Sequence, residues 1–276
     1  MKITYAISDI VPYINWVYFY YAWGVHLRPD SEKEKLRREA EAALERVGER
    51  YQCFALFDIF DACGCGDDIL IRTSSGNQQP VALPFLRQQQ PASGFLCLSD
   101  FIRPVSDPSD VNTYADKIGI FATSVSHGLE TDFDSDPYEK MMMQLLADRL
   151  AEATAERVHE DVRRRYWGYA PDEHLSIADL HVEKFQGIRP AVGYPSLPDT
   201  SFNFLIDSVL DLRKIGIRLT ESGAMKPHAS VSGLMISHPQ SHYFSVGKIG
   251  EDQLLDYSRR RGLPVEVCRK FLAANL

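Results

Sequence analysis

Residues 186–198 constrain the fold of this chain more than any other stretch. They read Gln-Gly-Ile-Arg-Pro-Ala-Val-Gly-Tyr-Pro-Ser-Leu-Pro, with three prolines and two glycines in thirteen residues. Proline lacks an N–H donor and fixes its own backbone angle, which excludes a regular helix and most strand pairing. Pro190 also drives Arg189 toward extended backbone, and Gly193 would let a partner approach the main chain. We therefore expect a stiff, irregular loop.

This loop holds one cation, Arg189, and one aromatic side chain, Tyr194. A guanidinium group can grip a carboxylate with two parallel hydrogen bonds, so the loop suits a small ligand that carries a carboxylate. The alternative is a rigid connector with a surface arginine and a packing tyrosine. Loops carry function only when other parts of the chain converge on them, so the loop alone leaves both interpretations open.

Composition narrows the classes of protein. The chain has 276 residues, a formal net charge of −8 and 45% hydrophobic residues, enough for a large core in a single domain. No basic block is present, so nucleic acid is not an expected partner. No apolar run approaches the roughly 20 residues that cross a bilayer, and residues 10–25, the nearest case, lack the features of a signal peptide. We expect a soluble, cytoplasmic protein without membrane contact.

Five cysteines are present, at positions 53, 63, 65, 97 and 268. An odd number in a large acidic chain argues against a disulfide framework. Cys63-Gly64-Cys65 could form half of a metal site, but no second Cys or His pair follows at the spacing of zinc ligands. The glycines and the following Asp67-Asp68 favour a turn between strands, so we predict no metal site.

Hydrophobic periodicity predicts an α+β fold. The expected helices lie within residues 8–24 and over 30–50, 137–167, 202–215, 251–261 and 265–274. The expected strands cover residues 53–60, 68–73, 80–86, 118–123, 231–237 and 243–246. Short connections between successive strands favour antiparallel pairing.

The long helix over residues 137–167 carries two carboxylates of interest. Asp148 and Glu152 are four residues apart, so both point to the same side, near the predicted buried face. Two like charges in this arrangement cost a few tenths of a kcal/mol unless a cation lies opposite. A solvated acidic edge explains the same pattern. The predicted buried face consists of Met141, Leu145, Ala147, Leu150, Ala151, Thr154 and Val158.

Familiar catalytic signatures are absent from the sequence. It has no Gly-x-Ser-x-Gly, no Walker loop, no Gly-x-Gly-x-x-Gly after a strand and no His-Glu-x-x-His. Residue patterns alone therefore lead to an acidic α+β protein with a candidate carboxylate-binding loop.

Several longer motifs resemble a known family, the C-terminal activation domain of cobalamin-dependent methionine synthase. They occur in the family's order across nearly the whole chain. The matching segments are Val11-Pro12-Tyr13-Ile14-Asn15-Trp16, Leu146-Ala147-Asp148-Arg149-Leu150-Ala151-Glu152, Tyr166-Trp167-Gly168-Tyr169-Ala170-Pro171, residues 186–195, Leu219-Thr220-Glu221-Ser222, Ala229-Ser230-Val231-Ser232-Gly233, Ser237-His238-Pro239 and residues 256–262.

This resemblance implies a fold and a function. The expected fold is a single curved domain over residues 1–276, with a bent, mainly antiparallel sheet flanked by helices. The domain would bind S-adenosylmethionine (SAM) and deliver its methyl group to cobalamin held by a neighbouring domain or a corrinoid protein. It would act after cobalt(I) has been oxidised to cobalt(II), with an electron from a flavodoxin-type partner. Catalysis would then consist of positioning, since the sulfonium is already an activated methyl donor.

The resemblance also implies residue roles. Arg189 would pair with the ligand carboxylate, and Ala191 and Gly193 would offer backbone contacts. Tyr194 would have the catalytic position beside the methyl group and the corrin. A guanidinium, carboxylates and aromatic faces suit a zwitterionic sulfonium. The residues that would complete the pocket are Glu152, Tyr243 and Phe244.

A second pair of acidic residues would face the corrinoid partner. Asp148 matches a family position that hydrogen-bonds the histidine released from cobalt. Its companion falls at Glu130 or Thr131, where the connection to the helix is shorter here than in the family. The resemblance therefore assigns Glu130 and Asp148 to the partner interface.

Two departures from the family qualify these expectations. Asn15 replaces an aspartate that contacts the ligand amine, so it brings no charge. The sequence also lacks an Asp-x-His-x-x-Gly cobalamin motif and folate or homocysteine modules, so the corrinoid must come from elsewhere. The chain would then be an excised piece or a free-standing protein. The main alternative is a docking module in which SAM controls only a conformation; a methyltransferase for a small non-corrinoid acceptor is the third.

Overall fold

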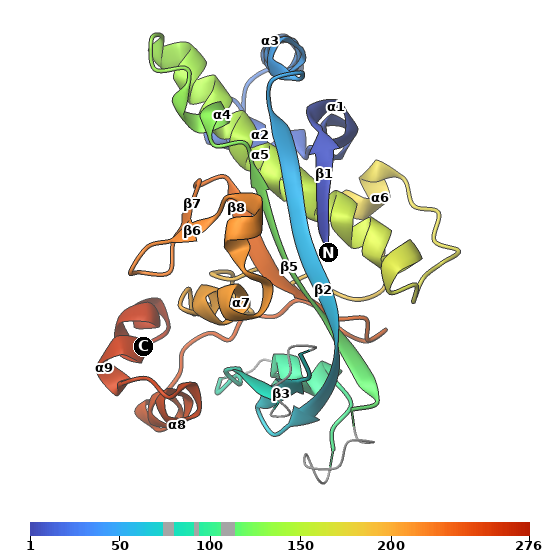
Figure 1. Cartoon of the computed structure of the whole chain (residues 1–276). Coiled ribbons are helices and arrows are strands. Elements are labelled where there is room, and N and C mark those ends of the chain that lie inside the picture. Colours follow the sequence, from blue (N-terminus) through green and yellow to red (C-terminus); the bar gives the residue numbers. More distant parts are fainter. Residues whose placement is uncertain (74–79, 91–93, 106–113) are drawn as a thin grey trace.

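A long central strand, β2 (Gln52–Cys65), organises the computed structural model, which describes residues 1–73, 80–90, 94–105 and 114–276. β5 (Asp116–Val125) runs antiparallel along one edge of β2, from Cys53 opposite Val125 to Ala62 opposite Asp116. The other edge pairs first with β1 (Lys2–Ala6) and then with β3 (Asp68–Ile71). Two different partners on one edge let the long strand bend between them (Figure 1).

The sheet is completed by β4 (Val81–Pro84) beside β3 and β8 (Ser230–Met235) beside β5. Its order is β4-β3-β2-β5-β8, with β1 on β2, and every pair is antiparallel. A separate two-stranded ribbon joins β6 (Arg218–Leu219) and β7 (Met225–Lys226). The predicted α+β fold with a bent, antiparallel sheet is confirmed.

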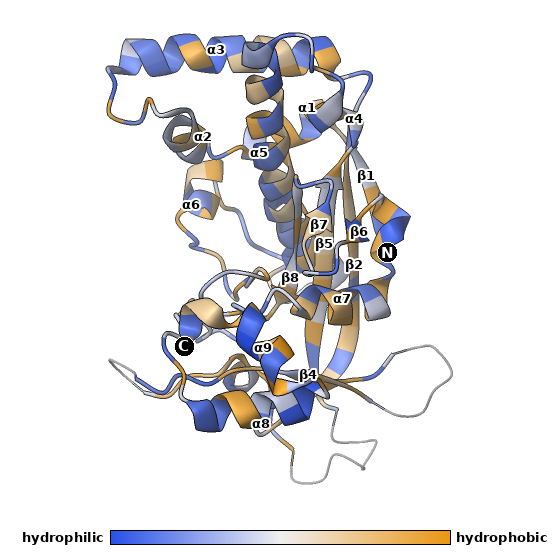
Figure 2. Cartoon of the chain, turned by 90° about the vertical axis from the view of Figure 1, so that its left-hand side faces the viewer, coloured by the Kyte–Doolittle hydropathy of each residue, from blue (hydrophilic) through white to orange (hydrophobic). Residues whose placement is uncertain are grey.

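Both faces of the sheet are covered. The long helix α5 (Pro137–Asp161) crosses one face, and α7 (Phe202–Leu210) lies on the other (Figure 1). Alternation along β5 divides the core, because Phe121 and Val125 pack on the α5 side and Ile118 and Ile120 on the α7 side. A strand buried on both faces is nearly continuously apolar, which Figure 2 shows for β5.

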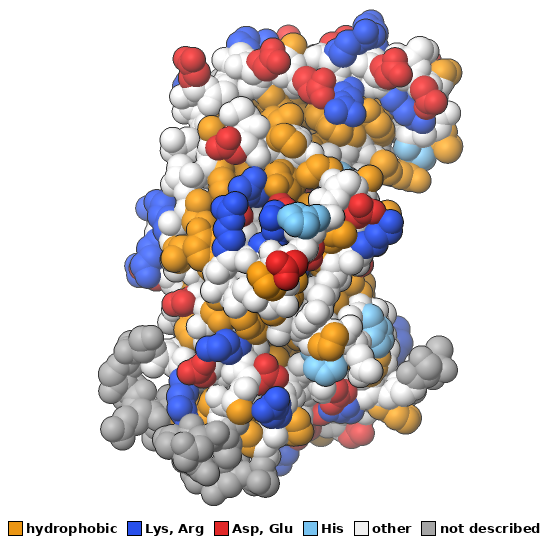
Figure 3. All heavy atoms as spheres, turned by 90° about the vertical axis from the view of Figure 1, so that its right-hand side faces the viewer, with side chains coloured by type: hydrophobic (Ala, Val, Ile, Leu, Met, Phe, Trp, Pro, Cys, Tyr) orange, Lys and Arg blue, Asp and Glu red, His pale blue; other side chains and the backbone are white. Residues whose placement is uncertain are grey.

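The remaining helices lie around this arrangement. At the N-terminal end are α1 (Ile7–Ile10), α2 (Trp16–Trp23) and α3 (Asp30–Val47). The solvent face of α3 presents interspersed acidic and basic side chains along the top of the molecule (Figure 3). Short helices α4 (Gly128–Thr131) and α6 (Ile177–His181) precede and follow α5. At the C-terminal end, α8 (Glu251–Arg261) and α9 (Val265–Phe271) enclose a small core of their own.

The predicted elements differ from the structure in several places. The short helix expected within residues 8–24 is confirmed as α2, but it is preceded by α1 and a 3₁₀ turn over Val11–Tyr13, which were not expected. The long helix ends at Asp161 and continues as a π-helical turn over Val162–Tyr166. The strand expected over residues 243–246 is irregular, and β1 was not predicted.

The predicted buried face of α5 is also partly wrong. Met141 is exposed and Leu145 is half-buried, whereas Met142, Met143 and Leu146 are buried. At the start of the helix, the buried positions lie one residue later than the predicted ones. From Ala147 onward the predicted positions, Leu150, Ala151, Thr154 and Val158, are buried as expected.

The turn predicted between two strands in this region is confirmed, but it is shorter than expected. Cys63, Gly64 and Cys65 belong to the end of β2, Gly66 and Asp67 form the turn, and β3 begins at Asp68. All five cysteines carry free thiols. Among the described residues, no cluster of three or more His, Cys, Asp or Glu side chains could hold a metal ion. No described helix is both long enough and apolar enough to span a bilayer.

Candidate functional site

The proline-rich loop lies along β8, at one end of the sheet. Ile188 and Ile236 exchange backbone hydrogen bonds of 2.9 and 3.0 Å, and the carbonyl of Pro190 accepts from the N–H of Leu234 at 3.0 Å. Pro190 thus contributes its one available backbone group, the acceptor. A Cβ atom at Gly233 would lie 2.3 Å from the Pro190 oxygen, so a glycine in β8 is required for this close approach.

The glycines of the loop serve its backbone shape. Both Gly187 and Gly193 have a φ of +89°, which side-chain-bearing residues rarely adopt. A Cβ atom at Gly187 would lie 2.4 Å from the Ile236 oxygen, whereas one at Gly193 would meet Thr200 at an ordinary 3.6 Å. Within the chain, close approach is therefore the role of Gly187 and Gly233, while Gly193 supplies the left-handed turn.

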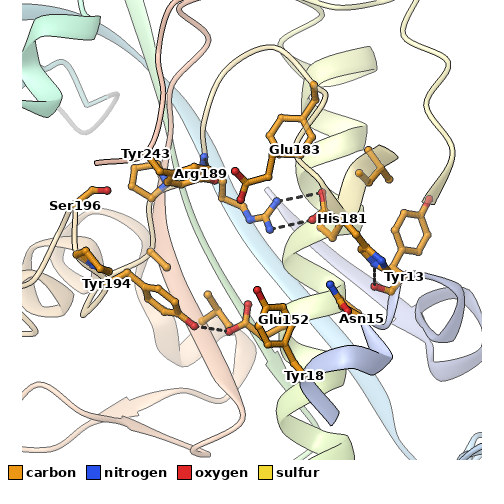
Figure 4. Close-up of a pocket in the computed structure, with 18 of the residues that line it drawn as sticks. Tyr13, Asn15, Tyr18, Glu152, His181, Glu183, Arg189, Tyr194, Ser196 and Tyr243 are labelled. Carbon is orange, nitrogen blue, oxygen red and sulfur yellow. Dashed lines mark hydrogen bonds and ion pairs between the residues drawn. The ribbon is translucent and has the colours of Figure 1, made fainter. Parts of the chain in front are cut away.

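A cavity of about 630 Å³ lies between this loop, α5, the start of α2 and the segment after α6 (Figure 4). Its volume is in the range that holds small-molecule ligands. Of the residues that the sequence assigned to a ligand, Gly193 is not among those lining it. Those that do line it are Asn15, Glu152, Arg189, Ala191, Tyr194, Tyr243 and Phe244.

Arg189 is held from three sides. Its Nη1 and Nη2 donate to the two carboxylate oxygens of Glu156 at 3.4 and 3.2 Å, and Nη1 also donates to Nδ1 of His159 at 3.2 Å. Its backbone N–H donates to the hydroxyl oxygen of Tyr243 at 2.9 Å. The side chain is 14% exposed. Burial is the largest single effect and lowers the pKa of Arg189, but the charge and hydrogen bonds of Glu156, together with Tyr243 and Glu152, raise it overall.

Glu156 and His159 were not identified from the sequence. The signal was present, since Asp148, Glu152 and Glu156 continue one stripe at intervals of four residues along α5. Arg189, on the loop, is the cation that lies opposite this stripe, and its guanidinium group bonds Glu156. The sequence pattern does not indicate which of the three carboxylates it contacts.

Tyr194 and Glu152 were predicted separately but bond to each other. The Tyr194 hydroxyl donates to Oε1 of Glu152 at 3.0 Å (Figure 4). The negative charge of Glu152, together with burial, raises the pKa of Tyr194 to about 12, so the phenol stays protonated. Tyr194 is 54% exposed. Its ring therefore lies where the cavity opens to solvent.

Asn15 has a structural role besides lining the cavity. Its Oδ1 accepts the backbone N–H of Val17 at 3.2 Å, which caps the N-terminus of α2. With the amide oxygen used in this way, its NH₂ group is the part available to a ligand. Asparagine here therefore supplies a hydrogen-bond donor and no charge.

Charges in the cavity favour a cationic ligand. Glu152, Glu156 and Glu183 contribute three carboxylates, against the two guanidinium groups of Arg149 and Arg189. Burial raises the pKa of Glu183, and the charge of Arg189 opposes this shift. One negative charge is in excess, and a guanidinium stands among the carboxylates. A zwitterion with an additional positive group matches this arrangement.

Glu130 and Asp148 lie outside the cavity lining. Glu130, on α4, accepts the backbone N–H of Ala229 at 2.5 Å. Burial raises the pKa of Asp148; Arg149 lowers it and the charge of Glu130 raises it further. Asp148 lies one turn of α5 before Glu152, and Glu130 on α4 is near enough for its charge to act on Asp148. Their predicted contact with a partner stays a prediction.

Two comparisons relate the chain to known proteins. Residues 6–262 match a family model described as the activation domain of vitamin B12-dependent methionine synthase. A solved structure, the crystal structure of the MetH reactivation domain bound to AdoHcy, is similar with a TM-score of 0.89 and 35% sequence identity. The alignment covers 100% of this chain and 90% of that one.

Proposed function

Since the chain belongs to the family of activation domains of vitamin B12-dependent methionine synthase, we propose that its cavity binds SAM and presents the methyl group to cobalamin on a partner domain or protein. Methyl transfer would restore the cofactor after its cobalt has been oxidised. A flavodoxin-type protein would supply the electron. The proposal is supported by a similar structure that binds AdoHcy, the demethylated form of SAM.

The arrangement around Arg189 carries the proposal. Glu156 accepts one N–H from Nη1 and one from Nη2 of Arg189. The N–H of Nε and the second N–H of Nη2 then lie together along one side of the guanidinium group. Two parallel donors on this edge suit the carboxylate of the methionyl tail. Glu156 and Glu183 would lie near enough to the tail to balance its ammonium group.

Residues at the other end of the cavity would position the methyl group. There, the aromatic ring of Tyr194 and the carboxylate of Glu152 offer favourable surroundings for a sulfonium. Cobalamin, when held by the partner, would supply a reduced cobalt as the nucleophile for the methyl carbon, with S-adenosylhomocysteine as the leaving thioether. The chain itself needs no acid or base for this step, because the sulfonium is already activated. Its contribution is orientation.

Calorimetric titration with SAM tests the site. Arg189→Ala removes the carboxylate-binding group and leaves Glu156 buried without its cation, so we expect binding to weaken by about 2–3 kcal/mol. Arg213→Ala is the matched control, since it removes an exposed Arg–Asp pair on the surface. Undiminished affinity in Arg189→Ala would show that SAM binds elsewhere or that the arginine does not hold it.

A further inference from the structure

His159 is a buried polar residue that the proposed transfer step does not use. It lies near the C-terminal end of α5, with none of its surface exposed. Its Nδ1 is 3.2 Å from Nη1 of Arg189, and its Nε2 is 3.3 Å from the hydroxyl of Tyr169. Burial and the charges of Arg163 and Arg189 hold the pKa of His159 well below its usual value. The imidazole is therefore neutral.

The hydrogen bonds fix which nitrogen carries the proton. A guanidinium group has donors only, so Nδ1 of His159 must accept from Arg189. The ring proton is then on Nε2, which donates to the Tyr169 oxygen. Tyr169 thereby provides the acceptor for the Nε2 proton, which stabilises the tautomer that the arginine requires.

These contacts use three of the five N–H donors of the Arg189 guanidinium group. Glu156 takes one N–H from each terminal nitrogen, and His159 takes the second N–H of Nη1. Because the guanidinium is planar and rigid, fixing these three donors fixes the direction of the other two. Those two, on Nε and Nη2, form the edge that is left for a ligand.

We propose that His159 is a positioning residue for ligand recognition, which orients Arg189 toward the carboxylate of the methionyl tail. The proposal rests on the proposed function, because it concerns the same cavity and ligand. It differs from a purely structural role of His159 in one measurable respect. A positioning role affects only ligands that carry the carboxylate, whereas a structural role affects every ligand of the cavity.

Two probes separate these roles in calorimetric titrations. S-adenosylhomocysteine carries the amino-acid tail, and 5′-methylthioadenosine has the nucleoside and sulfur without it. His159→Phe keeps a ring but removes the acceptor, so we expect about tenfold or more loss of affinity for S-adenosylhomocysteine, as for a lost hydrogen bond to a charged group. Affinity for 5′-methylthioadenosine should stay within about twofold of the wild type, since no contact to Arg189 is involved.

His159→Asn tests the same point without removing the acceptor. The asparagine Oδ1 can take the place of Nδ1, so this variant should recover most of the lost affinity. Tyr169→Phe leaves the Nε2 proton of His159 without its acceptor and should weaken S-adenosylhomocysteine alone. Both variants keep the test decisive should His159→Phe not fold. Thr154→Val is the matched control, a buried polar-to-apolar change on the same helix, away from the cavity.

Three results would overturn the inference. One is equal loss for both probes in the His159 and Tyr169 variants, which indicates a structural role. Another is unchanged affinity for S-adenosylhomocysteine in those variants. The third is failure of the wild-type chain to bind S-adenosylhomocysteine, which would overturn the proposed function as well. Selective loss of the carboxylate-bearing probe, with rescue by His159→Asn, supports the inference.

Discussion

Tyr194 has two separable parts, a hydroxyl that bonds Glu152 and a ring at the mouth of the cavity. The ring should favour the sulfonium of SAM over the neutral thioether of S-adenosylhomocysteine. We expect Tyr194→Ala to weaken SAM by about 1 kcal/mol more than S-adenosylhomocysteine, the size of a partly exposed cation–π contact. Tyr194→Phe should keep the preference for SAM. Parallel titrations with both ligands measure it, and equal losses in Tyr194→Ala would argue against contact with the sulfonium.

His159 predicts a pH dependence of stability. The unfolded chain binds a proton at this residue below about pH 6.5, whereas the buried imidazole stays neutral. Below this pH the unfolded state therefore binds more protons than the folded state. The contribution of His159 to the free energy of unfolding is complete above pH 6.5 and is lost as the pH falls. Urea unfolding of wild type and His159→Asn at pH 5 and pH 8 tests this. The variant should lose less stability on acidification; parallel losses would contradict a buried neutral histidine.

At the residue level, the sequence names several of the residues that line the cavity, among them Arg189, Glu152 and Tyr194. Arg189 and Tyr194 could be identified because a proline-rich loop restricts what they can do, and the family resemblance assigned their roles. Glu156 could have been found by extending the acidic stripe of α5. His159 could not, since a lone histidine on a helix has no pattern that reveals its contact with a distant arginine. Such contacts depend on how the loop lies against α5.

The cap of α2 couples a structural element to the cavity. Asn15→Ala should lower the free energy of unfolding by about 1 kcal/mol, because Val17 loses its acceptor. Asn15→Asp keeps the cap and adds a negative charge for the ligand ammonium group, so it should strengthen the binding of both SAM and S-adenosylhomocysteine. Asp136→Ala is the control, as it removes the cap of α5 away from the cavity. Unchanged affinity for both ligands in Asn15→Asp would place the ligand ammonium group elsewhere.

The elements show where periodicity succeeds and where it fails. The amphipathic helix α3 and helix α8 follow their patterns closely, because each has one solvated face. β1 is a short edge strand whose pairing partner lies some fifty residues away, so only tertiary structure reveals it. The irregular segment after residue 242 is apolar enough to suggest a strand. Its backbone bonds the loop instead, where the N–H of Val246 donates to Pro195.

The whole molecule places one loop, one helix and one bent sheet around a single cavity. β8 holds the loop by backbone hydrogen bonds, and α5 contributes Glu152, Glu156 and His159, which bond Tyr194 and Arg189 of the loop. The bend of the sheet was expected from the family resemblance and not from periodicity, which reports which residues are buried but not how strands curve. The same structure is compatible with a docking module that binds SAM without transferring its methyl group.

Transfer of a labelled methyl group distinguishes these two functions and tests the central claim most directly. The chain is mixed with a cobalt(II) corrinoid protein, a reduced flavodoxin-type donor and methyl-labelled SAM. We predict label on cobalt and an equal amount of S-adenosylhomocysteine, with much slower transfer in Arg189→Ala. A stable complex that consumes no SAM and leaves cobalt unlabelled would contradict the account.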